Sequence, residues 1–306
     1  SRCSNHHVHF LKDMKSIKNI DVKDDFLISK RFVDSLKPDW LVVDHYSLSN
    51  NWLLMMKAEF PSLKILVIDD TAQNNFSCDI LLNQNYGFRV QDYEYNYANC
   101  SKYLMGSEYA LLRPEFNRNI EDAKKIRADS KLRDTFLVST GGTYNEKLNL
   151  IIFKALSQLP EKPKIQFLSP FDLRNKEIFK DILTLNLNLE LIEQKDFLKS
   201  MLSSSIYIGA GGSINWERSC LGLPGIVFSM AENQSRIIEK LEDQGSVIDL
   251  GYYNSIKEVK VIDSIEKVRN DKLFYSKMVK ASFAVTEGKG AELVTKELER
   301  INYEKG

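Results

Sequence analysis

Short apolar runs recur along the chain, and several of them are separated by stretches with helical periodicity. The apolar runs occupy residues 39–43, 64–68, 79–82, 135–139, 164–168, 206–208 and 225–228. Helical patterns cover residues 31–36, 52–60 and 148–159, and the last two stop before Pro61 and Pro160. Continuous apolar runs of this length are typical of parallel strands that helices cover on both faces. The pattern therefore predicts an α/β protein with two doubly wound sheets.

The chain is long enough for two domains, because its 306 residues exceed the usual size of a single core. The segment 117–133 is charged and polar, and we place the domain junction there. We expect an N-terminal Rossmann-like domain over residues 1–125 and a C-terminal nucleotide-binding Rossmann-like domain over residues 126–306. Open α/β sheets bind ligands at the carboxyl ends of their strands, so polar residues at those ends are the site candidates.

The composition argues against several classes of function. Lys plus Arg and Asp plus Glu both total 42, so no basic excess favours a nucleic acid. The four cysteines form no C-x-x-C pair, and His6, His7 and His9 have no fitting acidic partner, so we predict no metal site. No apolar run reaches the roughly 20 residues needed to cross a bilayer, and the first residues given do not have the pattern of a signal peptide. The sequence predicts a cytoplasmic protein with neither a membrane nor a nucleic-acid partner.

The strongest chemical signal is a glycine-rich turn after the strand at residues 206–208. Gly211, Gly212 and Ser213 lead into a helix, where free N–H groups favour a phosphate. Glu217 lies one turn further on the same helix face, where a carboxylate can accept hydrogen bonds from a ribose. The alternative is a tight strand-to-helix turn with a glutamate that stabilises the helix dipole.

A polar pair follows the next strand, at residues 225–228. Asn233 and Gln234 come at its carboxyl end, on the ligand side of an open sheet. The alternative for this pair is a solvated loop.

Together these motifs resemble the C-terminal half of GT-B-fold nucleotide-sugar proteins. More narrowly, the chain is similar to the UDP-2,4-diacetamido-2,4,6-trideoxy-β-L-altropyranose hydrolase family of bacterial pseudaminic acid biosynthesis. Further matching segments lie at residues 43–46, 68–70, 78–85, 106–113 and 287–291. The resemblance spans nearly the whole chain and implies a GT-B-like fold, with two Rossmann-like domains facing each other across a cleft.

The resemblance also implies an activity and a substrate. Family members hydrolyse a UDP-linked 2,4-diacetamido-2,4,6-trideoxy hexose to UDP and the free sugar, and we expect inversion at the anomeric carbon. By the same resemblance Ser213 and Glu217 bind the nucleotide, and Asn233 and Gln234 lie near the sugar or phosphate. The expected partner is therefore a UDP-sugar, and no cofactor is implied.

A second group of residues is implied on the reaction side. The family's Asp-His-Tyr after an N-terminal-domain strand matches Asp44, His45 and Tyr46, with the tyrosine at the reaction centre. All three follow an apolar strand, where α/β sites lie. The alternative for Tyr46 is a packed side chain with a satisfied hydroxyl.

The chain departs from the family in two places. Gly141, Gly142 and Thr143 match a phosphate or sugar loop, but Tyr144 replaces the usual aspartate. The family's G-x-G-H-x-x-R loop, which carries its catalytic histidine, has no counterpart in the sequence given. We therefore expect an N-terminal segment to be missing, and the chain as given to bind UDP but hydrolyse its UDP-sugar poorly or not at all.

Two other functions remain open from the sequence. A GT-B glycosyltransferase would use the same donor site with a different acceptor. A catalytically inactive nucleotide-sugar-binding protein would bind without turnover. UDP release without an acceptor favours the hydrolase.

Overall fold

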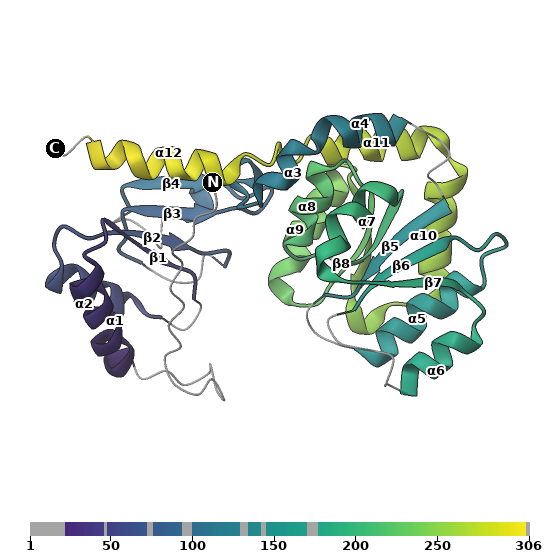
Figure 1. The fold of residues 1–306 in the computed structure, drawn as a ribbon, viewed down its shortest axis with the longest axis horizontal. Coiled ribbons are helices and arrows are strands. Elements are labelled where there is room, and N and C mark those ends of the chain that lie inside the picture. The colour runs from purple at the N-terminus through teal and green to yellow at the C-terminus, as the bar shows by residue number, and fades with distance from the viewer. Residues whose placement is uncertain are drawn as a thin grey trace. The chain divides into compact units, whose positions relative to one another are not determined.

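A computed structural model of the chain describes residues 22–45, 48–71, 76–93, 100–128, 134–141, 145–169 and 177–303. It contains two sheets of parallel strands with helices between successive strands (Figure 1), so the predicted doubly wound α/β class is confirmed. The chain divides into two compact units. The first holds residues 1–83, 88–105 and 296–306, and the second holds residues 84–87 and 106–295.

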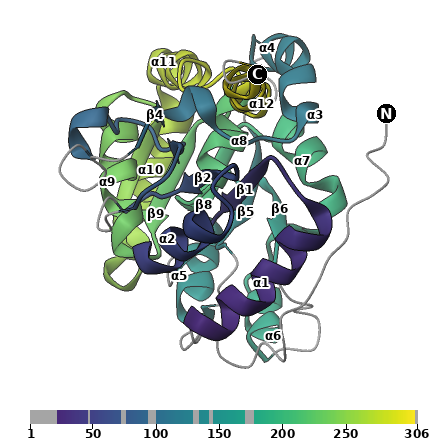
Figure 2. The ribbon, with the colours of Figure 1, turned by 90° about the vertical axis from the view of Figure 1, so that its left-hand side faces the viewer.

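The first unit is built on a four-stranded sheet in the order β1-β2-β3-β4. The strands are β1 (Trp40–Val43), β2 (Lys64–Ile68), β3 (Ile80–Asn83) and β4 (Lys102–Met105). The helices are α1 (Val22–Leu36), α2 (Asn50–Glu59), η1 (Val90–Asp92) and the second half of α12 (Gly290–Tyr303). Helices α1 and α2 lie side by side (Figure 2). Strands β2 and β3 lie inside the sheet and are almost wholly buried, as their continuous apolar sequences predict.

The second unit is built on a six-stranded sheet in the order β10-β9-β8-β5-β6-β7. Its strands are β5 (Thr135–Ser139), β6 (Lys164–Leu168), β7 (Asn188–Ile192), β8 (Ile206–Ala210), β9 (Gly225–Ser229) and β10 (Val247–Tyr252). Counted from β5, this is the 3-2-1-4-5-6 order of doubly wound nucleotide-binding sheets. The chain order reverses between β5 and β8, so ligands are expected at the carboxyl ends of these two strands.

Helices cover both faces of this second sheet. They are η2 (Ser107–Tyr109), α3 (Pro114–Arg118), α4 (Ile120–Ala128), α5 (Glu146–Ser157), α6 (Glu177–Thr184), η5 (Gln194–Asp196), α7 (Phe197–Ser203), α8 (Ile214–Cys220), α9 (Glu232–Asp243), η6 (Tyr253–Ser255), α10 (Glu258–Asn270) and α11 (Lys272–Phe283). Helix α5 packs against α6 and α10, and α8 packs against α11 (Figure 1). In the core, the rings of Phe153 and Phe167 meet edge to face with centroids 4.9 Å apart.

The compact units divide the chain differently from the boundary expected at residues 125/126. Helices α3 and α4 belong to the second unit, because the Arg127 guanidinium donates to backbone carbonyls there. The end of the chain returns to the first unit, where Lys64 Nζ donates to Ile301 O at 2.8 Å and Lys102 pairs with Glu297. The polar segment 117–133 thus contains a helix, α4, whose buried residues Ala123 and Arg127 were not recognised as a packing face.

Candidate functional site

The second unit has a pocket of about 270 Å³ at the carboxyl ends of β5 and β8, where the chain order of the sheet reverses. Its walls are Thr140, Gly141, Tyr207, Ala210, Gly212, Ser213, Ile214, Met230 and Gln234. These residues come from the carboxyl ends of β5, β8 and β9 and from the helices that follow. Four of the sequence-predicted residues, Gly141, Gly212, Ser213 and Gln234, therefore meet in one pocket.

The turn after β8 presents backbone donors to this pocket. Gly211 N–H donates to Phe228 O at 2.9 Å, and Gly212 O accepts from Asn215 N at 3.0 Å. Within the described part of the chain, the N–H groups of Gly212, Ser213 and Ile214 donate no hydrogen bond. Three consecutive unpaired N–H groups on a pocket wall are suited to an anion with several oxygens, such as a diphosphate.

Gln234 adds a side-chain donor beside the turn. Its Oε1 accepts from Met230 N at 2.9 Å, which fixes the amide so that Nε2 is the free end. Nε2 lies 3.4 Å from the position that a Cβ on Gly212 would occupy. The half-buried Asn233 precedes it in the first turn of α9.

Glu217 lies in the first turn of α8, with 23% of its side chain exposed, but it is not part of the pocket wall. Burial raises the pKa of this carboxyl, and Arg113 opposes the rise while Glu115 adds to it. The Arg113 Nη2 atom is 3.9 Å from Glu217 Oε1, whereas its Nη1 atom is 2.9 Å from Glu115 Oε1. Because Arg113 is shared between two acids, Glu217 keeps acceptor capacity for a ligand.

Tyr207 connects the two strands under the pocket and was missed from the sequence. Its buried hydroxyl lies 3.1 Å from Ser139 O and 3.0 Å from Ala210 O. Burial raises the pKa of this phenol, so it stays a neutral donor. The sequence places Tyr207 at the second residue of a predicted strand, but it does not show which carbonyl groups lie near the hydroxyl.

In the first unit the structure places two of the three predicted reaction-side residues. Asp44 and His45 directly follow β1, where Asp44 is exposed and His45 is half-buried. Tyr46, like Gly142 and Thr143 of the other loop, lies outside the described residues. Because β1, β2 and β3 are parallel and in register, the residues that follow them share one edge of the sheet.

A polar cluster at the same edge was not predicted. Asp69 follows β2 and accepts from the N–H and the hydroxyl of Thr71 at 3.0 and 2.7 Å. The buried Tyr93 hydroxyl donates to Asp69 O at 3.0 Å and accepts from the Asn83 amide. In the sequence, Asp69 belongs to residues 68–70, one of the segments that match the hydrolase family. In the structure it follows the end of β2 and accepts local hydrogen bonds.

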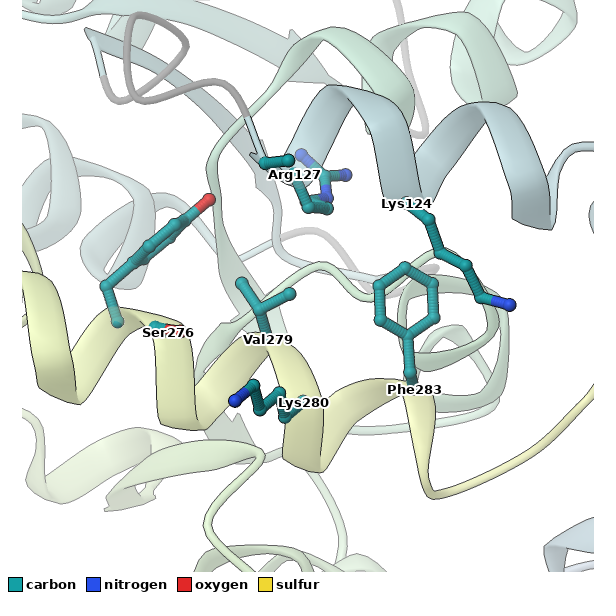
Figure 3. A pocket seen from close by; sticks show the side chains of 8 residues that line it. Lys124, Arg127, Ser276, Val279, Lys280 and Phe283 are labelled. Carbon is teal, nitrogen blue, oxygen red and sulfur yellow. The ribbon is translucent and has the colours of Figure 1, made fainter.

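A second hollow in the second unit, of about 350 Å³, lies between α4 and α11 (Figure 3). Its walls are Lys124, Arg127, Ala128, Tyr275, Ser276, Val279, Lys280 and Phe283. The buried Arg127 donates to Leu221 O at 3.2 Å, to Met201 O at 2.6 Å and to Ser204 O. Burial lowers the pKa of Arg127 to about 10. Its guanidinium thus ties α4 to three neighbouring carbonyls, which is a structural role.

The described ranges contain no group of three His, Cys, Asp or Glu side chains placed to hold a metal ion. None of the helices in those ranges is both long and apolar enough to span a bilayer.

The chain is similar in sequence to two characterised proteins, although no protein-family model matches it. It is 25% identical over 268 residues to the spore coat polysaccharide biosynthesis protein SpsG of Bacillus subtilis, covering 87% of this chain and 77% of that protein. It is 27% identical over 217 residues to the UDP-2,4-diacetamido-2,4,6-trideoxy-beta-L-altropyranose hydrolase of Campylobacter jejuni, covering 71% of this chain and 75% of that protein. The resemblance to the hydrolase family is confirmed.

Solved structures share the fold. MurG of Acinetobacter baumannii aligns with a TM-score of 0.66 at 13% identity, covering 91% of this chain and 78% of that chain. A UDP-GlcNAc 2-epimerase from Neisseria meningitidis, solved bound to UDP-GlcNAc, aligns with a TM-score of 0.59 at 14% identity, covering 91% and 81%. These likenesses confirm the GT-B-type α/β fold class.

Proposed function

We propose that this protein is a UDP-sugar enzyme that hydrolyses a UDP-linked 2,4-diacetamido-2,4,6-trideoxy hexose to UDP and the free sugar, with inversion. Nucleotide binding is supported by one observation: the unpaired N–H groups of Gly212, Ser213 and Ile214 lie on one pocket wall. That pocket lies where doubly wound sheets bind nucleotides. The choice of sugar and of hydrolysis is supported by the similarity to the Campylobacter jejuni enzyme.

In this proposal the second unit binds the UDP half of the substrate. The diphosphate accepts hydrogen bonds from the three N–H groups and from Gln234 Nε2. The ribose hydroxyls donate to the Glu217 carboxylate, the role that acidic residues have in related dinucleotide sheets. As the bond to the anomeric carbon breaks, negative charge grows on the departing UDP, and fixed backbone donors stabilise it without having to reorient.

The reaction-side residues are proposed to be Asp44, His45 and Tyr46. A base among them would remove a proton from water as the water attacks the anomeric carbon on the face opposite UDP, which gives inversion. The imidazole of His45 and the carboxylate of Asp44 are both suited to this step, and both directly follow β1. The loop at Gly141, Gly142 and Thr143 is proposed to contact the phosphate or the sugar.

The test is a direct assay of UDP release from UDP-2,4-diacetamido-2,4,6-trideoxy-β-L-altropyranose, with UDP-GlcNAc as the comparison substrate. Release without any acceptor, together with a sugar product of inverted anomeric configuration by early NMR spectra, supports the hydrolase. Release that requires a second sugar or lipid acceptor favours a glycosyltransferase instead. UDP binding without turnover of either substrate, by a chain that also carries the family's G-x-G-H-x-x-R segment, contradicts the enzymatic proposal and leaves a binding protein.

A further inference from the structure

The turn that lines the pocket is held from behind by two fully buried polar side chains of α8. The Asn215 amide Nδ2 donates to Gly211 O at 2.7 Å, and its Oδ1 accepts from Arg218 Nε at 2.8 Å. Both side chains are 0% exposed. The result is a short relay, from Arg218 through Asn215 to Gly211, beneath the pocket wall.

Gly211 is fixed on its other sides as well. Its N–H donates to Phe228 O at 2.9 Å, so both of its polar backbone groups have partners. A Cβ at this position would lie 2.4 Å from Ile238 Cδ1, so only glycine allows the close packing seen here. The conformation of the turn therefore depends on packing and on the Asn215 hydrogen bond together.

The relay determines the direction of a pocket donor because a peptide unit is planar and trans. The carbonyl of Gly211 and the N–H of Gly212 belong to the same peptide and point in opposite directions. Asn215 draws the carbonyl inward toward α8. The N–H of Gly212, which donates no hydrogen bond within the described residues, is thereby directed away from α8, and Gly212 is part of the pocket wall.

Arg218 determines which end of the Asn215 amide meets that carbonyl. A guanidinium is only a donor, so it requires the amide oxygen, and this leaves the amide nitrogen for Gly211 O. Arg218 also donates through Nη1 to Leu223 O at 3.0 Å and to Ser246 O at 3.3 Å. These contacts hold the guanidinium in place from the loops that precede β9 and β10.

The burial of the Arg218 guanidinium carries a cost in folding free energy. Arg218 forms no ion pair with a carboxylate of the described chain, and its Nη2 atom is buried without a hydrogen-bond partner. Burial lowers its pKa to about 9, as expected for a cation with only neutral acceptors. A buried charge without an ionic partner carries a desolvation cost that neutral acceptors offset only in part, and an unpaired Nη2 adds to that cost, which favours a role beyond packing.

We propose that Asn215 and Arg218 are positioning residues that orient the Gly211–Gly212 peptide so that its N–H binds the diphosphate. This inference rests on the proposed nucleotide-binding function. It predicts that loss of the relay weakens recognition of the phosphates and leaves recognition of the nucleoside unchanged.

Three variants test the proposal by calorimetry of the full chain with UDP and with uridine. Asn215→Asp keeps the acceptor for Arg218 but removes the donor to Gly211 O. The double variant Asn215→Leu with Arg218→Met removes the relay without leaving a stranded charge. Ser219→Ala is the matched control, because Ser219 is a buried residue of the same helix whose hydroxyl has no hydrogen-bond partner.

We expect both relay variants to bind UDP about 10- to 100-fold more weakly, the loss expected for one hydrogen bond to a charged group. Their uridine affinity and the UDP affinity of Ser219→Ala should match the wild type. A fourth variant, Arg218→Lys, should keep much of the wild-type UDP affinity, since an ammonium also requires the amide oxygen. The double variant excludes the added charge of Asn215→Asp as the cause.

The proposal is overturned if the double variant binds UDP as tightly as the wild type. It is also overturned if folded relay variants lose UDP and uridine binding equally, because that result indicates a general structural role. If the wild-type chain binds neither UDP nor uridine, the proposed function itself is refuted. This result differs from a failure of the relay proposal because it is seen before any substitution is made.

Discussion

Replacing Gly209 by alanine tests whether the contact between β5 and β8 supports the nucleotide pocket. An added Cβ would lie 1.9 Å from Ser139 O and 2.5 Å from the Tyr207 hydroxyl oxygen. Carbon and oxygen atoms do not approach this closely, and one of the two obstacles is backbone. Either the two strands move apart or Tyr207 leaves the carbonyls that it bridges.

The expected cost follows from these two contacts. Overpacking of a well-packed interior costs about 1–3 kcal/mol. A buried hydroxyl or carbonyl left without its partner costs about 1–3 kcal/mol more. We therefore expect Gly209→Ala to lower the free energy of unfolding by about 2–6 kcal/mol. With a urea m-value of about 2 kcal/mol/M, the midpoint should fall by about 1–3 M.

Gly212→Ala is the matched control for this experiment. The nearest atom to its new Cβ is Gln234 Nε2 at 3.4 Å, the end of a flexible side chain. We expect a change in unfolding free energy within about 0.5 kcal/mol, but weaker UDP binding, because the methyl group lies beside two proposed phosphate donors. Urea unfolding followed by circular dichroism gives the first quantity, and calorimetry gives the second. An unfolding midpoint for Gly209→Ala equal to that of the wild type would refute the reasoning.

Three further substitutions have expected outcomes. Burial raises the pKa of Glu217, so stability that depends on its protonated form is lost as the pH rises through that pKa. Glu217→Gln should therefore not destabilise the fold at neutral pH. It should weaken UDP binding by about 1–3 kcal/mol. Calorimetry across pH should also show that the variant does not share the loss of UDP affinity that the wild type has on acidification. Tyr207→Phe removes the hydroxyl that lies within hydrogen-bond distance of Ser139 O and Ala210 O, and should lower the unfolding free energy by about 1–3 kcal/mol in urea titrations. Arg127→Met removes the donor to three buried carbonyls and should cost about 3 kcal/mol or more by thermal unfolding, with UDP affinity unchanged in the folded fraction.

The strands that the sequence revealed are those whose burial leaves a continuous apolar run. Strands β2, β5 and β9 are of this kind, and their bounds match the predicted ranges closely. Strand β7 was missed because it lies at an edge and its residues Asn188–Ile192 are only partly buried. Strand β10 was missed because Asp249 interrupts its apolar pattern. In both cases the neighbouring strand determines the conformation, and a local pattern carries little information about it.

The candidate site shows the same division between local and non-local information. Gly211, Gly212 and Ser213 could be proposed from the sequence because a strand, small residues and a helix follow each other directly. Asn215 and Arg218 could not, because their role depends on carbonyl groups that folding brings to them from the turn and from the loops before β9 and β10. In the sequence alone, an asparagine and an arginine here are typical of ordinary polar positions in a helix.

The two units therefore contribute different kinds of support to the proposed reaction. In the second unit, neutral donors converge on one pocket, and such donors hold a departing diphosphate equally well whether water or a sugar hydroxyl is the nucleophile. The pocket thus selects the donor substrate but does not select the acceptor. The acceptor is chosen where the nucleophile loses its proton, which the proposal assigns to Asp44, His45 and Tyr46. Substitutions at Gly212 or Gln234 should accordingly change UDP affinity, whereas substitutions at His45 should change turnover with UDP affinity unaltered. This separation follows because the unpaired N–H groups and the Gln234 amide lie in one compact unit, while β1 and the residues after it lie in the other.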